Sequence, residues 1–293
     1  MNKRRKLFTR EEKTAYALLA FPLIWWGIFF LYAFIRAIYF SFTDITVDIS
    51  AISNFNFDNY TRLFHDVVFL KAIRNTLIWT LVMTFFNNFF GLMIAYFITK
   101  IKRGQKLFLT LLFWPTLVSS VINADITKLV FSPSDTGLMN TILKFFNLQP
   151  LYWYNDEKLS LITLMIIPML LGFSTQMMIY YVAIKGVDKS LVEAAKMDGA
   201  TNGQILRNIY IPSIVNSIGY NLILSIIGGI KVIAPMQLVS NGGPLDSSMS
   251  IMLYLYQNTT TELAYACSIG VVTLLIILGL TFIQMKLTPK ESE

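Results

Sequence analysis

The sequence predicts an all-α, polytopic membrane protein with six transmembrane helices. Hydrophobic residues make up 55% of the 293 positions, mean hydropathy is +0.58, and charged residues account for 14%, against roughly 25% in a typical soluble protein. A helix needs about 20 mostly apolar residues to cross the hydrocarbon core of a bilayer. Six stretches have this character: residues 15–40, 75–99, 107–131, 159–184, 213–235 and 263–285.

The six stretches differ in how cleanly they fit a membrane span. The cores of the first, second, fourth and sixth contain no charged residue. The first is also too long for a signal peptide and lacks a small-residue cleavage site, so we expect it to remain as a membrane helix. The third carries Asp125 and Lys128 towards its end, and the fifth carries Lys231. These two are therefore the least regular of the predicted spans.

The composition excludes several classes of protein. A water-soluble fold of this size needs more polar surface, and a disordered chain cannot hold so many apolar residues. Cys267 is the single cysteine, so no intrachain disulfide can form. His65 is the single histidine, which leaves no histidine cluster for a metal centre or a catalytic triad. We expect no metal site and no catalytic residue in this chain.

Lys and Arg residues concentrate on one side of the predicted spans. Of the 24, six precede the first span, four lie between the second and third, four between the fourth and fifth, and two follow the sixth. Because positive charge marks cytoplasmic loops, we expect both termini in the cytoplasm, in a multi-pass protein of a prokaryotic plasma membrane. The net charge of +7 then indicates these loops and contact with lipid, and no nucleic-acid partner is expected.

Three longer loops are predicted on the outer side, at about residues 41–70, 131–158 and 236–262. They are aromatic and somewhat acidic, and the last contains no Lys or Arg. Trp153, which lies between two tyrosines, is expected to be an interfacial anchor or part of a short surface helix. Since no linker or internal repeat is visible, residues 1–293 are predicted to form a single membrane domain.

The loop at residues 186–212 has an explicit local pattern. Ser190 and Glu193 fit a capping box, which predicts a helix beginning just after Ser190. Gly199 can end that helix in the left-handed conformation. Thr201 begins a second capping box with the glutamine three residues later, so a second short helix should follow. Spacing alone fits an ordinary surface hairpin as well as a functional one.

The same loop carries a recognisable motif. Glu193-Ala194-Ala195-x-x-Asp198-Gly199-Ala200, followed by Ile211-Pro212, resembles the EAA motif of permease subunits of binding-protein-dependent ABC importers. The rest of the chain resembles the carbohydrate branch of that family, related to the maltose and glycerol-phosphate permeases. The segments that carry this likeness are Ser41-Phe42-Thr43-Asp44, Asn59-Tyr60, Asn75-Thr76-Leu77, Pro115, Gly137-Leu138-Met139-Asn140, Asn241-Gly242-Gly243-Pro244 and Tyr254-Leu255-Tyr256.

The resemblance implies a specific assembly. The loop would be a coupling helix that docks on a cytoplasmic ATPase dimer, and the partner ATPase would hold ATP and Mg²⁺, since this chain has no Gly-x-x-x-x-Gly-Lys-Ser/Thr loop. A second, homologous permease chain would complete a heterodimer, and an extracytoplasmic binding protein would deliver a sugar or oligosaccharide for alternating access. The coupling residues implied are Glu193, Ala194, Ala195, Asp198, Gly199 and Ala200.

Polar residues within the spans are candidates for the substrate pathway, because buried polar groups in a bilayer face a cavity or pair with each other. They include Asn87, Asn88, Asn123, Asp125, Gln176, Asn216, Asn221 and Lys231. The alternative for each polar residue is an interhelical hydrogen bond. Gly228-Gly229 would break or thin the fifth span and admit a ligand, and the alternative for this pair is close packing against the sister chain. The resemblance favours the spans that flank the loop, and selects Gly172, Thr175, Gln176, Asn221, Ser225, Gly229 and Lys231.

Lys231 has three interpretations. It can form an ion pair with Asp125, it can extend to the outer surface, or it can bind an anionic substrate. Competing functions remain at this stage: a secondary transporter without an ATPase, and an ABC permease for a non-sugar or anionic solute. A secondary transporter usually shows inverted repeats or more intramembrane charge, and a membrane enzyme needs paired acids or histidines that this chain does not provide.

Overall fold

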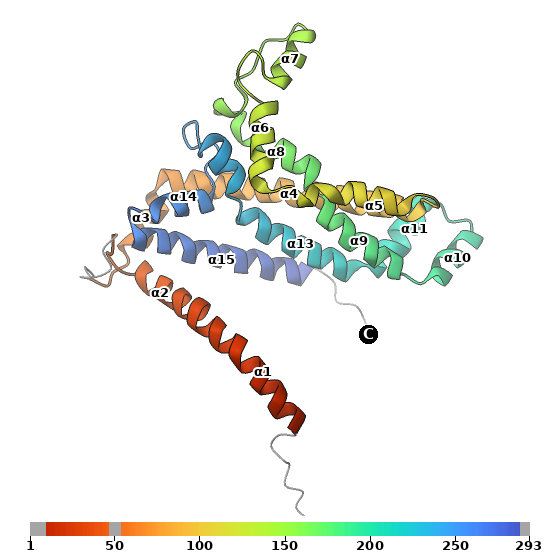
Figure 1. The fold of residues 1–293 in the computed structure, drawn as a ribbon, viewed down its shortest axis with the longest axis horizontal. Coiled ribbons are helices and arrows are strands. Elements are labelled where there is room, and N and C mark those ends of the chain that lie inside the picture. Colours follow the sequence, from red (N-terminus) through yellow and green to blue (C-terminus); the bar gives the residue numbers. More distant parts are fainter. Residues whose placement is uncertain (1–9, 47–53, 288–293) are drawn as a thin grey trace, which may run out of the picture. The chain divides into compact units, whose positions relative to one another are not determined.

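The computed structural model describes residues 10–46 and 54–287, which form helices joined by short loops (Figure 1). The chain divides into two compact units, Met1–Leu63 with Asn258–Val271, and Phe64–Gln257 with Val272–Glu293. The single membrane domain stays a prediction. The basic residues of segment 3–6 and Lys290, which contribute to the charge asymmetry, lie outside the described residues.

The first unit contains one long apolar helix and a small core. The apolar segment Thr14–Ser41, a helix of 28 residues, begins within α1 (Arg10–Trp26) and continues through η1 (Gly27–Leu31) and α2 (Tyr32–Ser41). At its end the Asn59 amide donates hydrogen bonds to the carbonyl oxygens of Ser41 and Thr43, at 3.2 and 2.8 Å. Two of the segments that carry the sequence resemblance are therefore in direct contact.

The second unit is built along α4 (Val67–Lys100), the longest helix. Helices α9 (Ser174–Gly186) and α13 (Val215–Ile230) pack along α4 (Figure 1). The apolar core between them contains Tyr96, Met177 and Tyr180, each at most 5% exposed. Helix α15 (Leu263–Leu287) is shared between the units, and in its second half the Gln284 amide donates to the Gly219 carbonyl oxygen at 3.2 Å.

Four helices are long and apolar enough to cross a membrane: Thr14–Ser41, Val67–Lys100, Ser160–Gly186 and Leu263–Lys286. They match the predicted first, second, fourth and sixth spans. Two further pairs of helices are long and apolar enough only when the two helices of a pair, which are bent relative to each other, count as one span. They are Gln105–Leu117 with Ser120–Val130, and Asn202–Ser213 with Val215–Ile230. The all-α polytopic class is confirmed, with four spans or up to six.

The predicted third span is not one straight helix, because the chain bends by 89° after Leu117. Helix α5 (Gln105–Phe113) leads into a short 3₁₀ turn, η3 (Trp114–Leu117), and Pro115 in that turn has no backbone N–H to extend an α-helix. Val118 is extended, and the Ser119 hydroxyl then accepts from the Ile122 amide to begin α6 (Ser120–Val130).

The predicted fifth span, residues 213–235, starts at a 75° bend between the preceding segment Asn202–Ser213 and the helix Val215–Ile230, and this helix ends at Ile230 instead of residue 235. Lys231 is the residue that follows the last turn of α13, and its N–H bonds back to the Ile227 and Gly229 carbonyl oxygens. The remaining elements are α3, α7, η4, α8, η6 and α14, at Asp58–His65, Leu138–Phe145, Trp153–Asn155, Ser160–Leu171, Met236–Ser240 and Ile251–Asn258.

Trp153 is not an interfacial anchor, because only 9% of it is exposed, but it does begin a short helix, the 3₁₀ turn η4. Its indole N–H donates to the Asn140 amide oxygen at 2.7 Å, and its ring meets Phe131 edge to face. Asn140 is fully buried and also donates to the Leu151 carbonyl oxygen at 3.1 Å. The Gly137–Asn140 segment of the resemblance therefore organises this loop around one buried amide, and the exposed neighbour is Tyr152.

Candidate functional site

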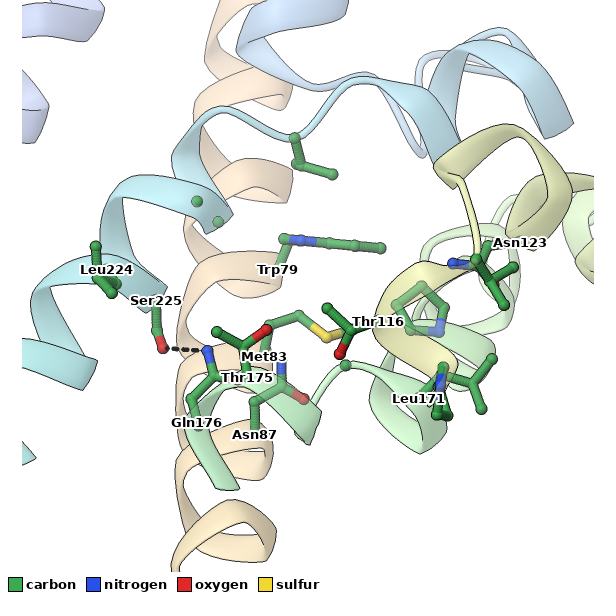
Figure 2. Close-up of a pocket in the computed structure, with 17 residues that line it drawn as sticks. Trp79, Met83, Asn87, Thr116, Asn123, Leu171, Thr175, Gln176, Leu224 and Ser225 are labelled. Atoms are coloured by element: carbon green, nitrogen blue, oxygen red, sulfur yellow. Dashed lines mark hydrogen bonds between the residues drawn. The ribbon is translucent and has the colours of Figure 1, made fainter. Parts of the chain in front are cut away.

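A cavity of about 390 Å³ lies in the second unit, where three helix irregularities meet (Figure 2). One is the bend between α5 and α6, and another is the junction of α8 and α9 at Gly172. The third is the Gly228-Gly229 pair near the end of α13. Non-helical backbone at membrane depth is tolerated where it lines a cavity. The position of the three irregularities around this cavity agrees with that rule.

Five of the seven predicted pathway residues line this cavity. They are Gly172, Thr175, Gln176, Ser225 and Gly229. Asn221 does not line it, because its side chain is fully buried and its amide donates to the Gln176 carbonyl oxygen at 3.4 Å. Lys231 does not line it either, and its side chain is exposed at the end of α13. The transport roles of all seven stay predictions.

Of the three interpretations of Lys231, the ion pair with Asp125 is wrong. Asp125 approaches Lys128 instead, one helical turn away on α6, with 4.0 Å between Nζ and Oδ1. Two-thirds of the Asp125 side chain is exposed, so this is a weak surface pair. Within residues 10–46 and 54–287, Lys231 has no carboxylate within ion-pair distance.

A buried hydrogen-bond network joins the cavity wall to the helices behind it. The Gln176 amide donates to the Ser225 hydroxyl at 3.2 Å, and the Asn88 amide donates to the same hydroxyl at 2.9 Å. The Tyr180 hydroxyl donates to the Asn88 amide oxygen at 2.7 Å. For Asn88 the interhelical hydrogen bond is therefore the correct interpretation. The network fixes one wall of the cavity, since it connects α4, α9 and α13.

The two glycines at the end of α13 have different surroundings. A Cβ on Gly229 would lie 2.9 Å from the Cα of Thr80 on α4, whereas a Cβ on Gly228 would meet nothing within 4 Å. Gly229 therefore allows α13 and α4 to pack closely, but the helix it meets belongs to the same chain and not to a sister chain. Gly228 leaves open space, and both residues line the cavity.

Sequence reasoning did not single out Trp79, which lines the cavity from α4. In Figure 2 its side chain extends from α4 towards α6, where Asn123 lies. Its exposed fraction is 4%. A tryptophan in an apolar span fits a lipid-facing position as well as a cavity. Trp79 lies on the same side of α4 as Asn87, eight residues later, and this helical spacing is the signal that could have placed it at the cavity.

The loop at 186–212 lies at the far end of α4 (Figure 1) and forms α10 (Lys189–Met197), α11 (Asn202–Ile205), η5 (Leu206–Tyr210) and α12 (Ile211–Ser213). The predicted capping box at Ser190 is wrong, because Asp188 is the N-cap and accepts from the Ser190 amide at 2.9 Å. Hydrogen bonds from the Ser190 backbone and side chain lower the pKa of Asp188.

The second half of the loop follows the prediction. Gly199 has φ +76°, the left-handed conformation expected at the end of α10. The Thr201 hydroxyl accepts from the Gln204 amide, and the Gln204 side chain accepts from the Thr201 amide at 2.7 Å. The capping box at Thr201 is confirmed. The two short helices are thus held by their own caps before any partner binds.

Three contacts attach this loop to the end of α4. The Tyr96 hydroxyl donates to the Asn202 carbonyl oxygen at 2.9 Å, and the Tyr210 ring meets the Tyr96 ring edge to face. Lys100 lies over the Tyr210 ring, with its Nζ 5.7 Å from the ring centroid. Ile205, which belongs to the loop, is itself buried. These contacts join the loop directly to α4.

The outer face of α10 is unpaired. Val192 is its buried residue, while Leu191 is 53% and Met197 88% exposed. Of the six predicted coupling residues, Glu193, Ala194, Asp198 and Gly199 are exposed and Ala195 and Ala200 are half-buried. Exposed apolar side chains next to small ones are typical of a docking surface. The docking role itself stays a prediction.

Comparison with known proteins identifies the family. Residues 107–292, which include the cavity-lining helices α6, α8, α9 and α13 and the loop, match the family described as "Binding-protein-dependent transport system inner membrane component". The chain belongs to this family. It is therefore a multi-pass permease of a transport system. In the described residues of this permease no group of three His, Cys, Asp or Glu side chains could hold a metal ion.

The permease is similar along nearly its whole length to curated relatives. It is 28% identical over 291 residues to the arabinooligosaccharides transport system permease protein AraP of Bacillus subtilis, covering 97% of this chain and 91% of the relative. It is 30% identical over 307 residues to the diacetylchitobiose uptake system permease protein NgcF of Streptomyces coelicolor, covering 97% and 86%. The similarity thus includes both compact units.

Solved structures share the fold of this permease. A chain of a bacterial alginate ABC transporter, crystallised in complex with an alginate pentasaccharide-bound periplasmic protein, superposes with a TM-score of 0.82 at 23% identity. The match covers 94% of this chain and 93% of that chain. At this identity the likeness establishes the arrangement of the helices and does not identify the solute.

Proposed function

We propose that this chain is the permease subunit of an ATP-driven importer that passes a sugar or oligosaccharide from an extracytoplasmic binding protein to the cytoplasm. The observation that carries the proposal is the position of two features on α4. Trp79 and Asn87 line an uncharged polar cavity, and Tyr96, further along the same helix, holds the loop that contains α10. The relatives named for arabinooligosaccharides and diacetylchitobiose support a carbohydrate as the solute.

In this proposal α10 docks on a separate cytoplasmic ATPase, which binds ATP and Mg²⁺. Glu193 meets a basic group of that partner, Ala194 and Ala195 allow a close fit, and Gly199 sets the turn. When the ATPase dimer closes, the loop moves with it, and its contacts with Tyr96 transfer the movement to α4. The helices around the cavity then alternate between an outward-open and an inward-open arrangement.

The proposed assembly includes a second, homologous permease chain, so that the cavity lies at the centre of a heterodimer. The Lys and Arg residues of the loop at 186–212, together with the six before the first span, support a cytoplasmic location for the loop and both termini. The family description supports a binding protein on the opposite side. The outer loops that include α7 and α14 are the parts of this chain that face it.

The experiment is copurification of the tagged chain from solubilised membranes, with wild type and Glu193→Ala side by side. Wild type should bring a second permease and an ATPase, and the purified assembly should hydrolyse ATP. Glu193→Ala should weaken ATPase recovery several-fold, because a charge-assisted contact is lost, while recovery of the second permease stays unchanged. A wild-type chain that purifies without any ATPase would contradict the proposal.

An acidic solute is a second candidate, because Lys231 is exposed, has no ion pair in the described part of the chain, and lies between the cavity-lining residues Gly229 and Val232. If Lys231 binds an anion, Lys231→Met should reduce uptake at least about tenfold, since a charged hydrogen bond contributes about 1.5–3 kcal/mol. Uptake by Lys231→Met and Lys231→Arg cells is the measurement. Uptake equal to wild type in both variants would exclude this candidate.

A further inference from the structure

Three amide oxygens in the cavity wall have no hydrogen-bond partner. They are Oδ1 of Asn87, Oδ1 of Asn123 and Oε1 of Gln176, and each is buried. Buried polar atoms in folded proteins are hydrogen-bonded with few exceptions. Asn140 obeys this rule, whereas the oxygen of Asn221, which does not line the cavity, is a further exception. Three exceptions in one cavity, from α4, α6 and α9, indicate that something else supplies the donors.

The positions of two of these amides are fixed by their neighbours. The Gln176 side chain already donates through Nε2 to the Ser225 hydroxyl, so its oxygen is the group left to accept. Asn87 lies against Gly172, where an added Cβ would be 3.0 Å from Nδ2 and 3.3 Å from Oδ1. Because glycine occupies position 172, the Asn87 amide has room at the junction of α8 and α9.

Helix α4 adds an aromatic surface to the same cavity. Trp79, Met83 and Asn87 are spaced four residues apart and all line the cavity (Figure 2), as expected for one stripe of a helix. Since 4% of Trp79 is exposed, a small part of its apolar indole ring borders the cavity, where it can contact C–H groups of a sugar ring. The amides then lie where the hydroxyl groups at the edge of that ring can donate to them.

The walls that this chain contributes to the cavity are uncharged. Among the described residues that line it, none is Asp, Glu, Lys, Arg or His. A carboxylate moved into such a cavity loses its hydration without gaining a counter-charge, which is strongly unfavourable. Polar but uncharged walls suit a ligand that is rich in hydroxyl groups and has no net charge.

We infer that Trp79, Asn87 and Asn123, from the α4 and α6 walls, form with Gln176 a subsite for an uncharged sugar ring, and that this subsite disfavours acidic sugars. The inference rests on the proposed function and deepens it. It assigns sugar contacts to two helices outside the pair that flanks the loop at 186–212. It also gives the partnerless amide oxygens a common ligand.

The test is equilibrium binding to the purified membrane assembly without its binding protein. The radiolabelled probes are maltotriose, arabinotriose, triacetylchitotriose and the acidic trigalacturonate. We expect at least one neutral probe to bind at least about tenfold more tightly than trigalacturonate. Asn87→Leu and Asn123→Leu should each weaken that binding about three- to tenfold, the effect of one lost hydrogen bond, and Trp79→Leu should weaken it at least as much.

Thr84→Val is the matched control, because the Thr84 hydroxyl oxygen is also buried and partnerless on α4 but does not line the cavity. It should bind the neutral probe as wild type does. Trigalacturonate binding as tightly as the neutral probes, no binding of any neutral probe at millimolar concentration, or unchanged binding in the Asn87 and Asn123 variants would each overturn the inference.

Copurification distinguishes a sugar subsite from a contact with the second permease chain. If the amides bond to the second permease chain, the variants should lose that chain on copurification. Probe binding should then fall only in proportion to the amount of second chain lost, and the inference would be wrong. Failure of the proposed function is distinguishable, since it appears as a wild-type chain without an ATPase, whatever the probes do.

Discussion

Replacing Ala194 with tryptophan should abolish ATP-driven uptake while leaving the chain folded and inserted. Ala194 is exposed on α10, about 200° around the helix from the buried Val192, so a large side chain there disturbs no contact within the chain. It does prevent a partner from approaching the helix closely. A docking loss of about 1.4 kcal/mol already corresponds to a tenfold change, and we expect uptake to fall at least that far.

Lys102→Trp is the control for this prediction. Lys102 is exposed in the short loop that follows α4 and lies outside α10, away from the proposed docking face. The control should retain most of the uptake and of the ATPase recovered on copurification. Equal uptake by Ala194→Trp and wild type would show that the outer face of α10 contacts no partner during transport.

Gly229→Ala should destabilise the packing of α13 on α4. An added Cβ would lie 2.8 Å from the Thr80 hydroxyl oxygen and 2.9 Å from the Thr80 Cα, and a rotation of the Thr80 side chain does not move the Cα. Overpacking of this kind costs about 1–3 kcal/mol. The expected result is a lower midpoint of thermal unfolding, by roughly 2–4 °C per kcal/mol, measured on the purified chain in detergent.

Gly228→Ala provides the comparison, since the added methyl group meets nothing within 4 Å. It carries the same gain in helix propensity, about 1 kcal/mol, without the clash, so its midpoint should equal or exceed that of wild type. If the two variants unfold at the same temperature, the close contact between Gly229 and Thr80 is not a determinant of stability.

The class of fold could be predicted from the sequence because apolar length is a strong signal. The boundaries of the four straight spans agree with the structure within a few residues, except at Val67. The bends were not predicted, although their signals are present. Pro115 and Ser119 interrupt an apolar run, but composition along a window does not reveal a change of direction. Such a change depends on which backbone groups find partners elsewhere.

The site was predicted in part for a similar reason. Asn87 and Asn88 are adjacent and equally plausible from the sequence, yet Asn88 bonds to Tyr180 and Ser225 whereas the Asn87 oxygen is partnerless in the cavity wall. Successive residues point about 100° apart on a helix, and only the neighbouring helices decide which direction is the cavity. The cap at Asp188 was missed because Asp188 and Ser190 are both good capping residues.

The most direct test of the account is uptake of a radiolabelled neutral trisaccharide into membrane vesicles that contain the complete importer, with ATP inside and the loaded binding protein outside. We predict uptake that requires ATP, persists when a protonophore removes the ion gradients, and is lost in Ala194→Trp vesicles. Uptake that continues without ATP and collapses with the gradients would contradict the account, because it would identify a secondary transporter.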